Sequence, residues 1–109
     1  MRRTKVATLA DAALRVSERE FQRTVIEYAE ARGWLVYSVP DSRRATSRGY
    51  PDLTMVRDGQ IIFAELKVLR GVVSKAQRTW LDELSALSLD PSVYIWRPSG
   101  WPEIELVLA

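Results

Sequence analysis

The stretch 49–67, GYPDLTMVRDGQIIFAELK, carries the strongest fold signal in the chain, because two apolar runs flank the pair Asp58-Gly59. A two-residue type I′ turn needs positive φ at both positions, and Asp-Gly is a favoured pair for it. Counting back from this turn places Asp52 opposite Glu65 on one face of the paired strands. The sequence therefore predicts a β-hairpin with two carboxylates at one end.

Helical and strand patterns alternate around this hairpin. Capping-box patterns, S-x-x-E and S-x-x-Q, start one helix after Ser17 and another after Ser74, and Gly33 suits the end of the first helix. The expected strands cover 34–39, 52–57, 60–67 and 93–97, and a short helical tail follows. We expect an arm or short helix at 1–16 and one α/β domain at 17–109, in the order α-β-β-β-α-β.

Two residue types are absent from the chain, which contains neither cysteine nor histidine. Disulfides, thiolate zinc sites, imidazole ligands and the serine–histidine and cysteine–histidine mechanisms are thereby excluded. Catalysis would have to use carboxylates, lysine, tyrosine, hydroxyls and a hard metal ion. Lack of cysteine suits a reducing compartment, and no apolar run approaches the roughly 20 residues of a spanning helix. We therefore expect a cytoplasmic protein.

Basic side chains gather in the middle of the chain, although the net charge is only +2. Segment 42–78 contains eight basic residues and three acidic ones, Asp52, Asp58 and Glu65, so its local charge is +5. Such a cluster suits a partner that bears phosphates, and a solvated face with a chance asymmetry is the alternative. The basic residues are Arg43, Arg44, Arg48, Arg57, Lys67, Arg70, Lys75 and Arg78.

The two opposed carboxylates of the hairpin repel each other unless one takes up a proton or a cation lies between them. Lys67 lies two residues beyond Glu65 on the same face and neutralises one charge. The oxygens that remain suit a hard divalent cation such as magnesium, which accepts one or two carboxylates and a substrate phosphate. The alternative is a solvent-facing hairpin end with an ordinary Glu65–Lys67 surface pair.

The motif Gly49-Tyr50-Pro51-Asp52, followed after twelve residues by Glu65-Leu66-Lys67, resembles the PD-(D/E)XK nuclease signature. The likeness is to the virus-type replication-repair nuclease (VRR-NUC) group in particular. That group also carries an acidic residue on the first helix and a Ser-x-x-Gln at the start of the helix after the motif. The similarity extends from about residue 17 to residue 97.

This resemblance implies a restriction-endonuclease-like core, with a mixed four-stranded sheet flanked by helices, and metal-dependent hydrolysis of phosphodiesters. It implies Asp52, Glu65 and the Leu66 carbonyl as ligands of Mg²⁺ or Mn²⁺, with Lys67 acting on the attacking water or on the phosphate. Stand-alone members of the group are phage-like or bacterial, and some act as dimers on branched DNA such as Holliday junctions. We accordingly expect a homodimeric, structure-selective endonuclease of DNA replication or repair.

The acidic residue on the first helix is either Glu18 or Glu20. Glu18 shares the inward side of the helix with Val25, whereas Glu20 lies nearly opposite at the third position of the capping box. We therefore favour Glu18 as the metal ligand. Gln77 is expected both to cap its helix and to position water or phosphate, and the predicted DNA contacts are Arg43, Arg44, Arg48, Arg70, Lys75 and Arg78.

Two other functions compete with a nuclease: a non-catalytic nucleic-acid-binding or assembly protein that keeps the fold, and a phosphate-binding module without hydrolysis. Retention of Asp52, Glu65 and Lys67 together favours catalysis. A small domain without an added targeting module is expected to recognise DNA shape and not base sequence. The choice between DNA and RNA, the preferred DNA structure and the strand polarity stay open from sequence.

Overall fold

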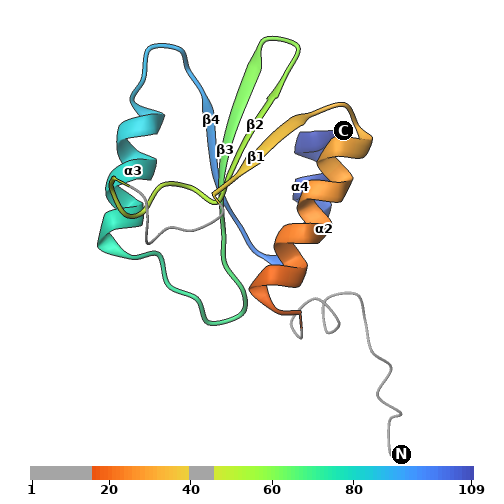
Figure 1. Ribbon diagram of the computed structural model, residues 1–109, viewed down its shortest axis with the longest axis horizontal. Coiled ribbons are helices and arrows are strands. Elements are labelled where there is room, and N and C mark those ends of the chain that lie inside the picture. The colour runs from red at the N-terminus through yellow and green to blue at the C-terminus, as the bar shows by residue number, and fades with distance from the viewer. Residues whose placement is uncertain (1–15, 40–45) are drawn as a thin grey trace, which may run out of the picture.

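The structure is a computed structural model that describes residues 16–39 and 46–109. The predicted arm at 1–15 and part of the arginine-containing loop, residues 40–45, lie outside the described residues. Figure 1 shows the arrangement of the elements. In chain order these are α2 (Glu18–Ala31), β1 (Leu35–Ser38), β2 (Leu53–Arg57), β3 (Gln60–Leu66), α3 (Lys75–Ser85), β4 (Ser92–Trp96), the 3₁₀ turn η2 (Pro98–Gly100) and α4 (Trp101–Leu108).

Helix α2 begins and ends where its sequence signals predict. The Ser17 hydroxyl accepts a hydrogen bond from the Glu20 N–H at 3.1 Å and caps the first turn. At the other end Gly33 adopts φ +86°, and the Trp34 N–H donates to the Ala29 carbonyl at 3.1 Å. This is a Schellman ending, and it turns the chain directly into β1.

The four strands form one mixed sheet in the order β1-β2-β3-β4. β1, β2 and β3 pair antiparallel, whereas β3 and β4 run parallel and are joined through α3. Asp58 and Gly59 have φ of 48° and 78°, and Leu53 pairs with Ala64, so the predicted turn and register of the hairpin are confirmed. The predicted α/β class with a mixed four-stranded sheet and flanking helices is confirmed as well.

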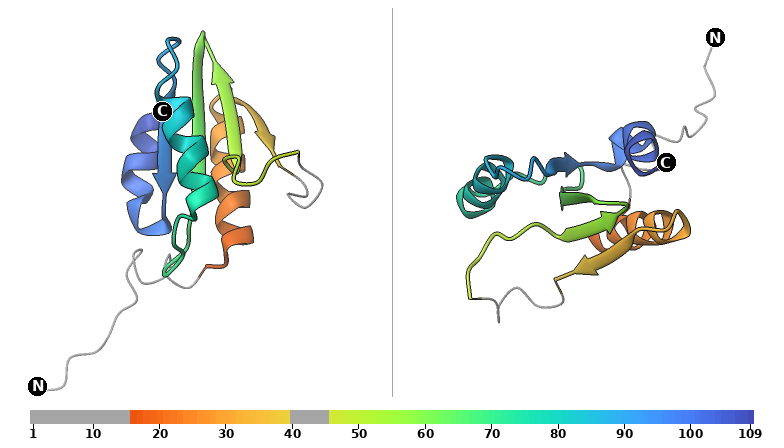
Figure 2. Two further views of the ribbon diagram at one scale, coloured as in Figure 1. Left: turned by 90° about the vertical axis from the view of Figure 1, so that its left-hand side faces the viewer. Right: turned by 90° about the horizontal axis from the view of Figure 1, so that it is seen from above.

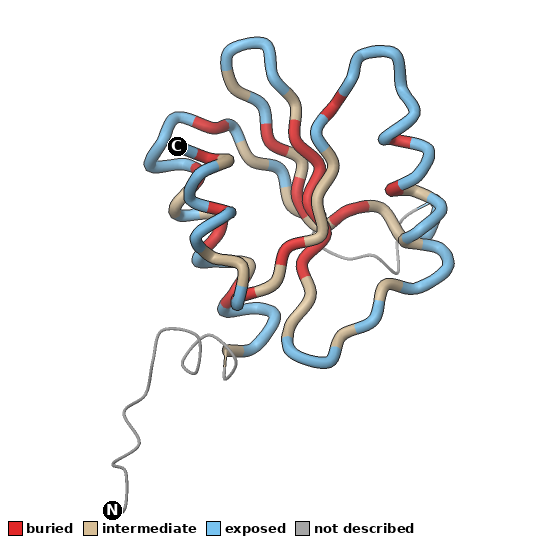
Figure 3. The backbone as a smooth tube through the Cα atoms, turned by 180° about the vertical axis from the view of Figure 1, so that it is seen from behind, coloured by how far each residue is buried: buried red, intermediate tan, exposed pale blue. Residues whose placement is uncertain are grey.

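The helices lie on both sides of the sheet, α3 on one side and α2 with α4 on the other (Figures 1 and 2). The main core lies between the sheet and the α2/α4 layer, and Figure 3 shows buried backbone running through the central strands into these helices. Burial of these side chains contributes most of the folding free energy. The core residues are Phe21, Val25, Ala29, Trp34, Leu53, Met55, Ile62, Ala64, Leu66, Trp96, Ile104 and Leu108.

The other face of the sheet is covered by α3, which buries Leu81 and Leu84. The helical spacing of Trp80, Leu81, Leu84 and Leu87 in the sequence predicts that all four share one apolar face. For Leu87 this prediction is wrong, because α3 ends at Ser85 and Leu87 is 46% exposed. Coverage of this face is also incomplete, since Val56 on β2 is 41% exposed. The two faces of the sheet are therefore covered to different extents.

None of the helices in the described ranges 16–39 and 46–109 is both long enough and apolar enough to cross a membrane.

Candidate active site

Asp52 lies immediately before β2, at the point where the β2–β3 ladder ends. The last backbone pair is Leu53 with Ala64, and beyond it the Asp52 Oδ2 atom accepts the Leu66 N–H at 2.9 Å. The carboxylate thus takes the place of a backbone acceptor and is fixed against the end of β3. Because the Lys67 N–H donates to the Trp96 carbonyl at 2.9 Å, the same end of β3 is also held by β4.

Glu65 is deeply buried, with a relative exposure of 1%. Its Oε2 atom accepts a hydrogen bond from Gln77 Nε2 at 2.7 Å and lies 3.3 Å from Lys67 Nζ. Its Oε1 atom is buried and has no hydrogen-bond partner among the residues that the structure describes. An unsatisfied buried oxygen costs free energy, and a proton shared with Asp52, a bound water or a cation would satisfy this one.

The two carboxylates perturb each other. Burial raises the pKa of Glu65 to about 7, and the neighbouring Asp52 charge adds to this rise. Burial also raises the pKa of Asp52, although the Leu66 N–H and the Lys67 charge oppose it. The single positive charge of Lys67 therefore does not compensate for the burial of two carboxylates. The predicted convergence of Asp52, Glu65 and Lys67 is therefore present in the structure.

Gln77 performs two tasks with one amide group. Its backbone N–H donates to Ser74 Oγ at 3.1 Å, and its Oε1 atom accepts from the Ser74 N–H at 2.8 Å, which completes the capping box of α3. Its Nε2 atom is left to donate to Glu65. The start of α3 and the orientation of the Glu65 carboxylate are thereby coupled. The sequence predicted the cap but not the bond to Glu65, and the positioning of water or phosphate by Gln77 stays a prediction.

The structure shows why the motif has a glycine at position 49, directly before Tyr50. It adopts φ +94°, and a Cβ atom at this position would lie 2.5 Å from the Ala76 carbonyl carbon and oxygen. No side chain fits such a contact, so the segment leading to Asp52 touches the backbone of the first turn of α3. Tyr50 then donates to or accepts from Thr54 Oγ1 at 3.0 Å and packs edge-on against Trp80.

A cavity of about 900 Å³ connects Asp52 with the first turns of α2. Glu18 and Glu20 both line it, so the cavity by itself does not distinguish the two candidate acids. At 100° per residue Glu18 lies on the side of α2 next to the buried residue Val25, and Glu20 lies farther round. The complete lining is Ser17, Glu18, Arg19, Glu20, Gln22, Arg23, Ile26, Val39 and Asp52.

Within residues 16–39 and 46–109, no group of three or more acidic side chains lies close enough together to hold a metal ion by itself. Asp52 and Glu65 form a pair, with the backbone of Leu66 held between them by its bond to Asp52. Glu18 shares the cavity with Asp52 without joining this pair. Two carboxylates with a neighbouring backbone carbonyl remain a ligand set that suits a hard cation.

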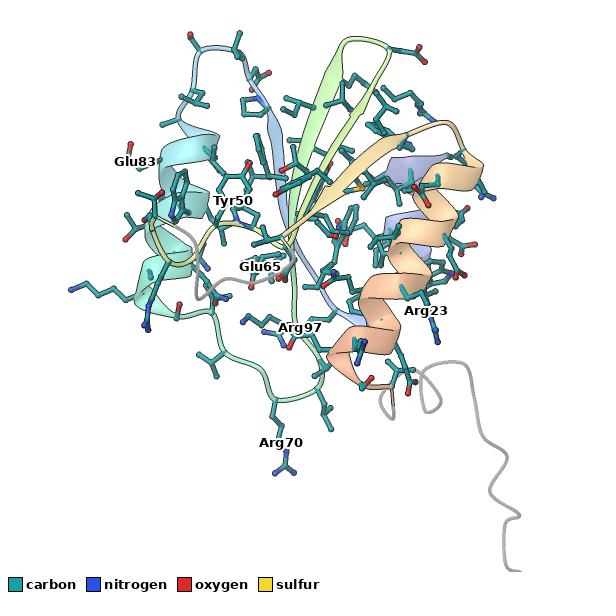
Figure 4. The ribbon with its side chains drawn as sticks, viewed as in Figure 1. Arg23, Tyr50, Glu65, Arg70, Glu83 and Arg97 are labelled. Carbon is teal, nitrogen blue, oxygen red and sulfur yellow. The ribbon has the colours of Figure 1, made fainter. Side chains whose placement is uncertain are left out.

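The predicted nucleic-acid contacts are distributed unevenly. Arg43 and Arg44 lie outside the described residues. Arg70 is exposed on the loop that follows the site, and Figure 4 shows it projecting below Glu65. Arg78 is exposed on α3 and lies 3.8 Å from Asp82, with which it forms an i,i+4 pair. The two other predicted contacts, Arg48 and Lys75, are exposed.

Three further arginines near the site were missed from the sequence. Arg97 is half-buried below Glu65 in Figure 4, and its Nη1 atom donates to the Val68 carbonyl at 3.4 Å. The parallel register ends with Leu66 beside Trp96, which brings Arg97 next to Lys67. Only the strand pairing reveals this proximity.

Arg19 and Arg23, spaced i,i+4 on α2, line the cavity. Their helical spacing is the sequence signal that could have identified them.

Comparison with protein-family models, with curated proteins and with solved structures finds no match for this chain.

Proposed function

We propose that this protein is a metal-dependent endonuclease that hydrolyses phosphodiester bonds in DNA. The observation that carries the proposal is the buried Glu65 carboxylate, which faces Asp52, contacts Lys67 and keeps one oxygen without a hydrogen-bond partner in the described part of the chain. Perturbed acids of this kind cluster at functional sites. A structural ion pair would not require two acids with raised pKa values beside one lysine.

The site has the donors that Mg²⁺ or Mn²⁺ prefers. Asp52 and the free Glu65 Oε1 atom would supply two carboxylate oxygens, and the Leu66 carbonyl is the third proposed ligand. A divalent ion bound there would activate water and offset charge on the phosphate. The residues present therefore fit such an ion, and its positive charge would oppose the rise that burial causes in both pKa values.

Lys67 supplies the cationic group of the site. Its side chain is only 13% exposed, and its ammonium group is held 3.3 Å from Glu65 Oε2. From this place the ammonium group can donate to the attacking water or to a non-bridging phosphate oxygen, and so stabilise the charge that develops there. Gln77 keeps Glu65 in position, because its amide is itself fixed by Ser74.

The motif, the hairpin register and the Ser-x-x-Gln helix support placing this chain among the VRR-NUC nucleases, with a restriction-endonuclease-like core. On this interpretation the substrate is branched or duplex DNA in bacterial or phage replication or repair, and the enzyme is a homodimer. Phosphate recognition is assigned to Arg48, Arg70, Lys75 and Arg78, and to Arg19 and Arg23 at the cavity. Arg43 and Arg44 keep the role predicted from sequence.

The test is incubation of the protein with end-labelled single strands, duplex, flap and four-way junction DNA, in Mg²⁺, in Mn²⁺ and in EDTA. We expect cleavage with either metal and none with EDTA. Lys67→Ala is expected to keep DNA binding and to lose about 10²-fold or more in cleavage rate. Cleavage by Lys67→Ala at the wild-type rate would exclude the assigned role and point to a contaminating nuclease.

The rival function, a non-catalytic DNA-binding or assembly protein, makes a different prediction. It would bind the same DNA without cleavage in any metal, and Asp52→Asn would leave binding unchanged with or without Mg²⁺. Size-exclusion chromatography with light scattering checks the dimer separately. A monomer at micromolar concentration that still cleaves junctions would exclude the dimer alone.

A further inference from the structure

The loop of residues 68–73, here called the site loop, joins two parts of the candidate active site. It begins directly after Lys67 and ends at Ser74, the N-cap of the helix that carries Gln77. Two large aliphatic side chains on it point into solvent: Leu69 is 53% exposed and Val72 is 80% exposed. Apolar side chains this exposed, at the edge of a charged site, are candidates for direct contact with a ligand.

The base of the site loop is held by short contacts. The Gly71 N–H donates to the Val68 carbonyl at 2.7 Å, and Arg97 Nη1 donates to the same carbonyl at 3.4 Å. A Cβ atom on Gly71 would lie 3.1 Å from Lys67 Cδ, so the stem of the lysine packs directly under the turn. The two exposed side chains are therefore presented from a backbone that is attached to the proposed catalytic lysine.

Charge around the site loop is positive. Arg70 lies between the two apolar residues in sequence and is exposed, and Arg97 contacts the base of the loop at the Val68 carbonyl. Figure 4 shows Arg70 at the outer end of the loop, on the same side of the sheet end as Glu65 and Arg97. Two aliphatic groups flanking an arginine thus lie beside a proposed phosphodiester-cleaving centre.

We propose that the site loop is a wedge that packs Leu69 and Val72 against bases unstacked next to the scissile phosphate, while Arg70 contacts the backbone. The inference rests on the proposed function. Aliphatic side chains inserted at a base step unstack it and kink the duplex, and a neighbouring cation offsets the approach of phosphates. A branch point, where stacking is already interrupted, lowers the cost of such an insertion.

A nucleic-acid partner is favoured over a protein partner by this position. The apolar pair is small, is divided by a cation, and lies within a few residues of Lys67, where the DNA strand must pass for hydrolysis to occur. Two of the other exposed leucines, Leu89 (81% exposed) and Leu106 (80% exposed), lie away from the site loop, on the α3–β4 connection and on α4. They provide a matched control.

The experiment uses the full chain and a four-way junction with 2-aminopurine, a base whose fluorescence rises on unstacking, next to the branch point. Binding is measured in Ca²⁺ and in EDTA, and cleavage is measured separately in Mg²⁺. We expect the wild type to raise the fluorescence about twofold or more, and the variant Leu69→Ser with Val72→Ser to lose most of this rise. Cleavage of the junction by that variant should fall about tenfold or more, with single-strand cleavage nearly unchanged.

The control variant, Leu89→Ser with Leu106→Ser, should retain both the fluorescence rise and the junction cleavage. Arg70→Gln should keep the rise but lower the slope of log affinity against log salt by about one. Thermal unfolding checks that each variant folds, and Leu69→Gln with Val72→Thr replaces the serine variant if that one does not.

Equal fluorescence and cleavage for the site-loop and control variants would overturn the wedge and leave the apolar pair to a protein partner. Absence of a fluorescence rise with the wild type would overturn it as well. A wild type that unstacks the junction in EDTA but cleaves no DNA in Mg²⁺ or Mn²⁺ would support the wedge and exclude the proposed nuclease.

Discussion

Gln77 Nε2 donates to Glu65 Oε2 at 2.7 Å, across the gap between the first turn of α3 and the end of β3. The opposite end of the same amide completes the helix cap with Ser74. The Gln77 side chain therefore links the start of α3 to the buried carboxylate of Glu65. A substitution of Gln77 must affect both, whereas a substitution of Ser74 affects chiefly the helix.

Gln77→Ala is predicted to lower the free energy of unfolding by about 2–3 kcal/mol, since it removes a cap and a hydrogen bond to a buried carboxylate. Ser74→Ala, the matched control, removes only the cap and should cost about 1 kcal/mol. Urea unfolding at neutral pH measures both values. If Gln77→Ala and Ser74→Ala proved equal in stability and in nuclease activity, the hydrogen bond from Gln77 to Glu65 would contribute to neither.

Glu65 makes the folded protein sensitive to pH in the direction opposite to an ordinary salt-bridged acid. Its pKa rises from the usual 4.5 to about 7, so between these values the folded state keeps a proton that the unfolded state has lost. The free energy of unfolding of the metal-free protein should therefore fall as pH rises through this window. Removing the Glu65 charge should stabilise the protein only at the alkaline end of this pH window.

Glu65→Gln is predicted to be more stable than the wild type above pH 7, by at most about 3 kcal/mol, and to lose this advantage below pH 4.5. Urea unfolding in EDTA across the range measures it. Asp58→Asn is the control, because the Asp58 side chain is 90% exposed and asparagine suits its turn conformation. A stability difference for Glu65→Gln that does not change with pH would contradict the assignment.

Divalent ions should stabilise the wild type under the same alkaline conditions. At a concentration about 100-fold above its dissociation constant, Mg²⁺ or Mn²⁺ would add about 2.7 kcal/mol to the free energy of unfolding. EDTA should reverse the gain. Asp52→Asn keeps an acceptor for the Leu66 N–H but loses the charge, so it should lose the metal effect without losing the fold. Retention of the full metal effect by Asp52→Asn would place the ion elsewhere.

Much of this geometry follows from local signals in the sequence. The Asp58-Gly59 pair fixed the turn and with it the register that brings Asp52 toward Glu65, because side-chain direction along a strand has period two. The Ser74 capping box likewise predicted where α3 begins. Such features depend on neighbouring residues only, and each was confirmed.

Contacts between elements that are distant in the sequence could not be predicted from such local signals. Arg97 lies beside Lys67 only because β4 pairs in parallel with β3, and Gly49 touches Ala76 only because α3 packs on that side of the sheet. The extent of α3 was also misjudged at Leu87, since an apolar residue in helical spacing does not reveal where a helix stops. Tertiary packing decides these points.

Gly49→Ala is predicted to cost far more than Gly59→Ala. Both positions have positive φ, but a Cβ on Gly59 meets nothing within 4 Å, whereas one on Gly49 lies 2.5 Å from the Ala76 backbone. Gly59→Ala should therefore cost about 1–2 kcal/mol, the conformational cost alone. Gly49→Ala should cost more and, by displacing the first turn of α3, lower cleavage. Equal costs in urea unfolding would show that α3 moves aside freely.

The helix acid can be identified by a matched pair, Glu18→Gln and Glu20→Gln. Both side chains line the cavity that reaches Asp52, and both lie in the first turn of α2, where loss of a negative charge costs a similar amount, about 0.3–1 kcal/mol. Glu18 lies on the side nearer the core, so Glu18→Gln should weaken Mg²⁺ or Mn²⁺ binding about tenfold, as expected for a group that acts directly or through a bound water. Calorimetric titration with metal, and cleavage rates in parallel, distinguish the two. Glu20→Gln should match the wild type in both measurements, and the reverse pattern would assign the role to Glu20.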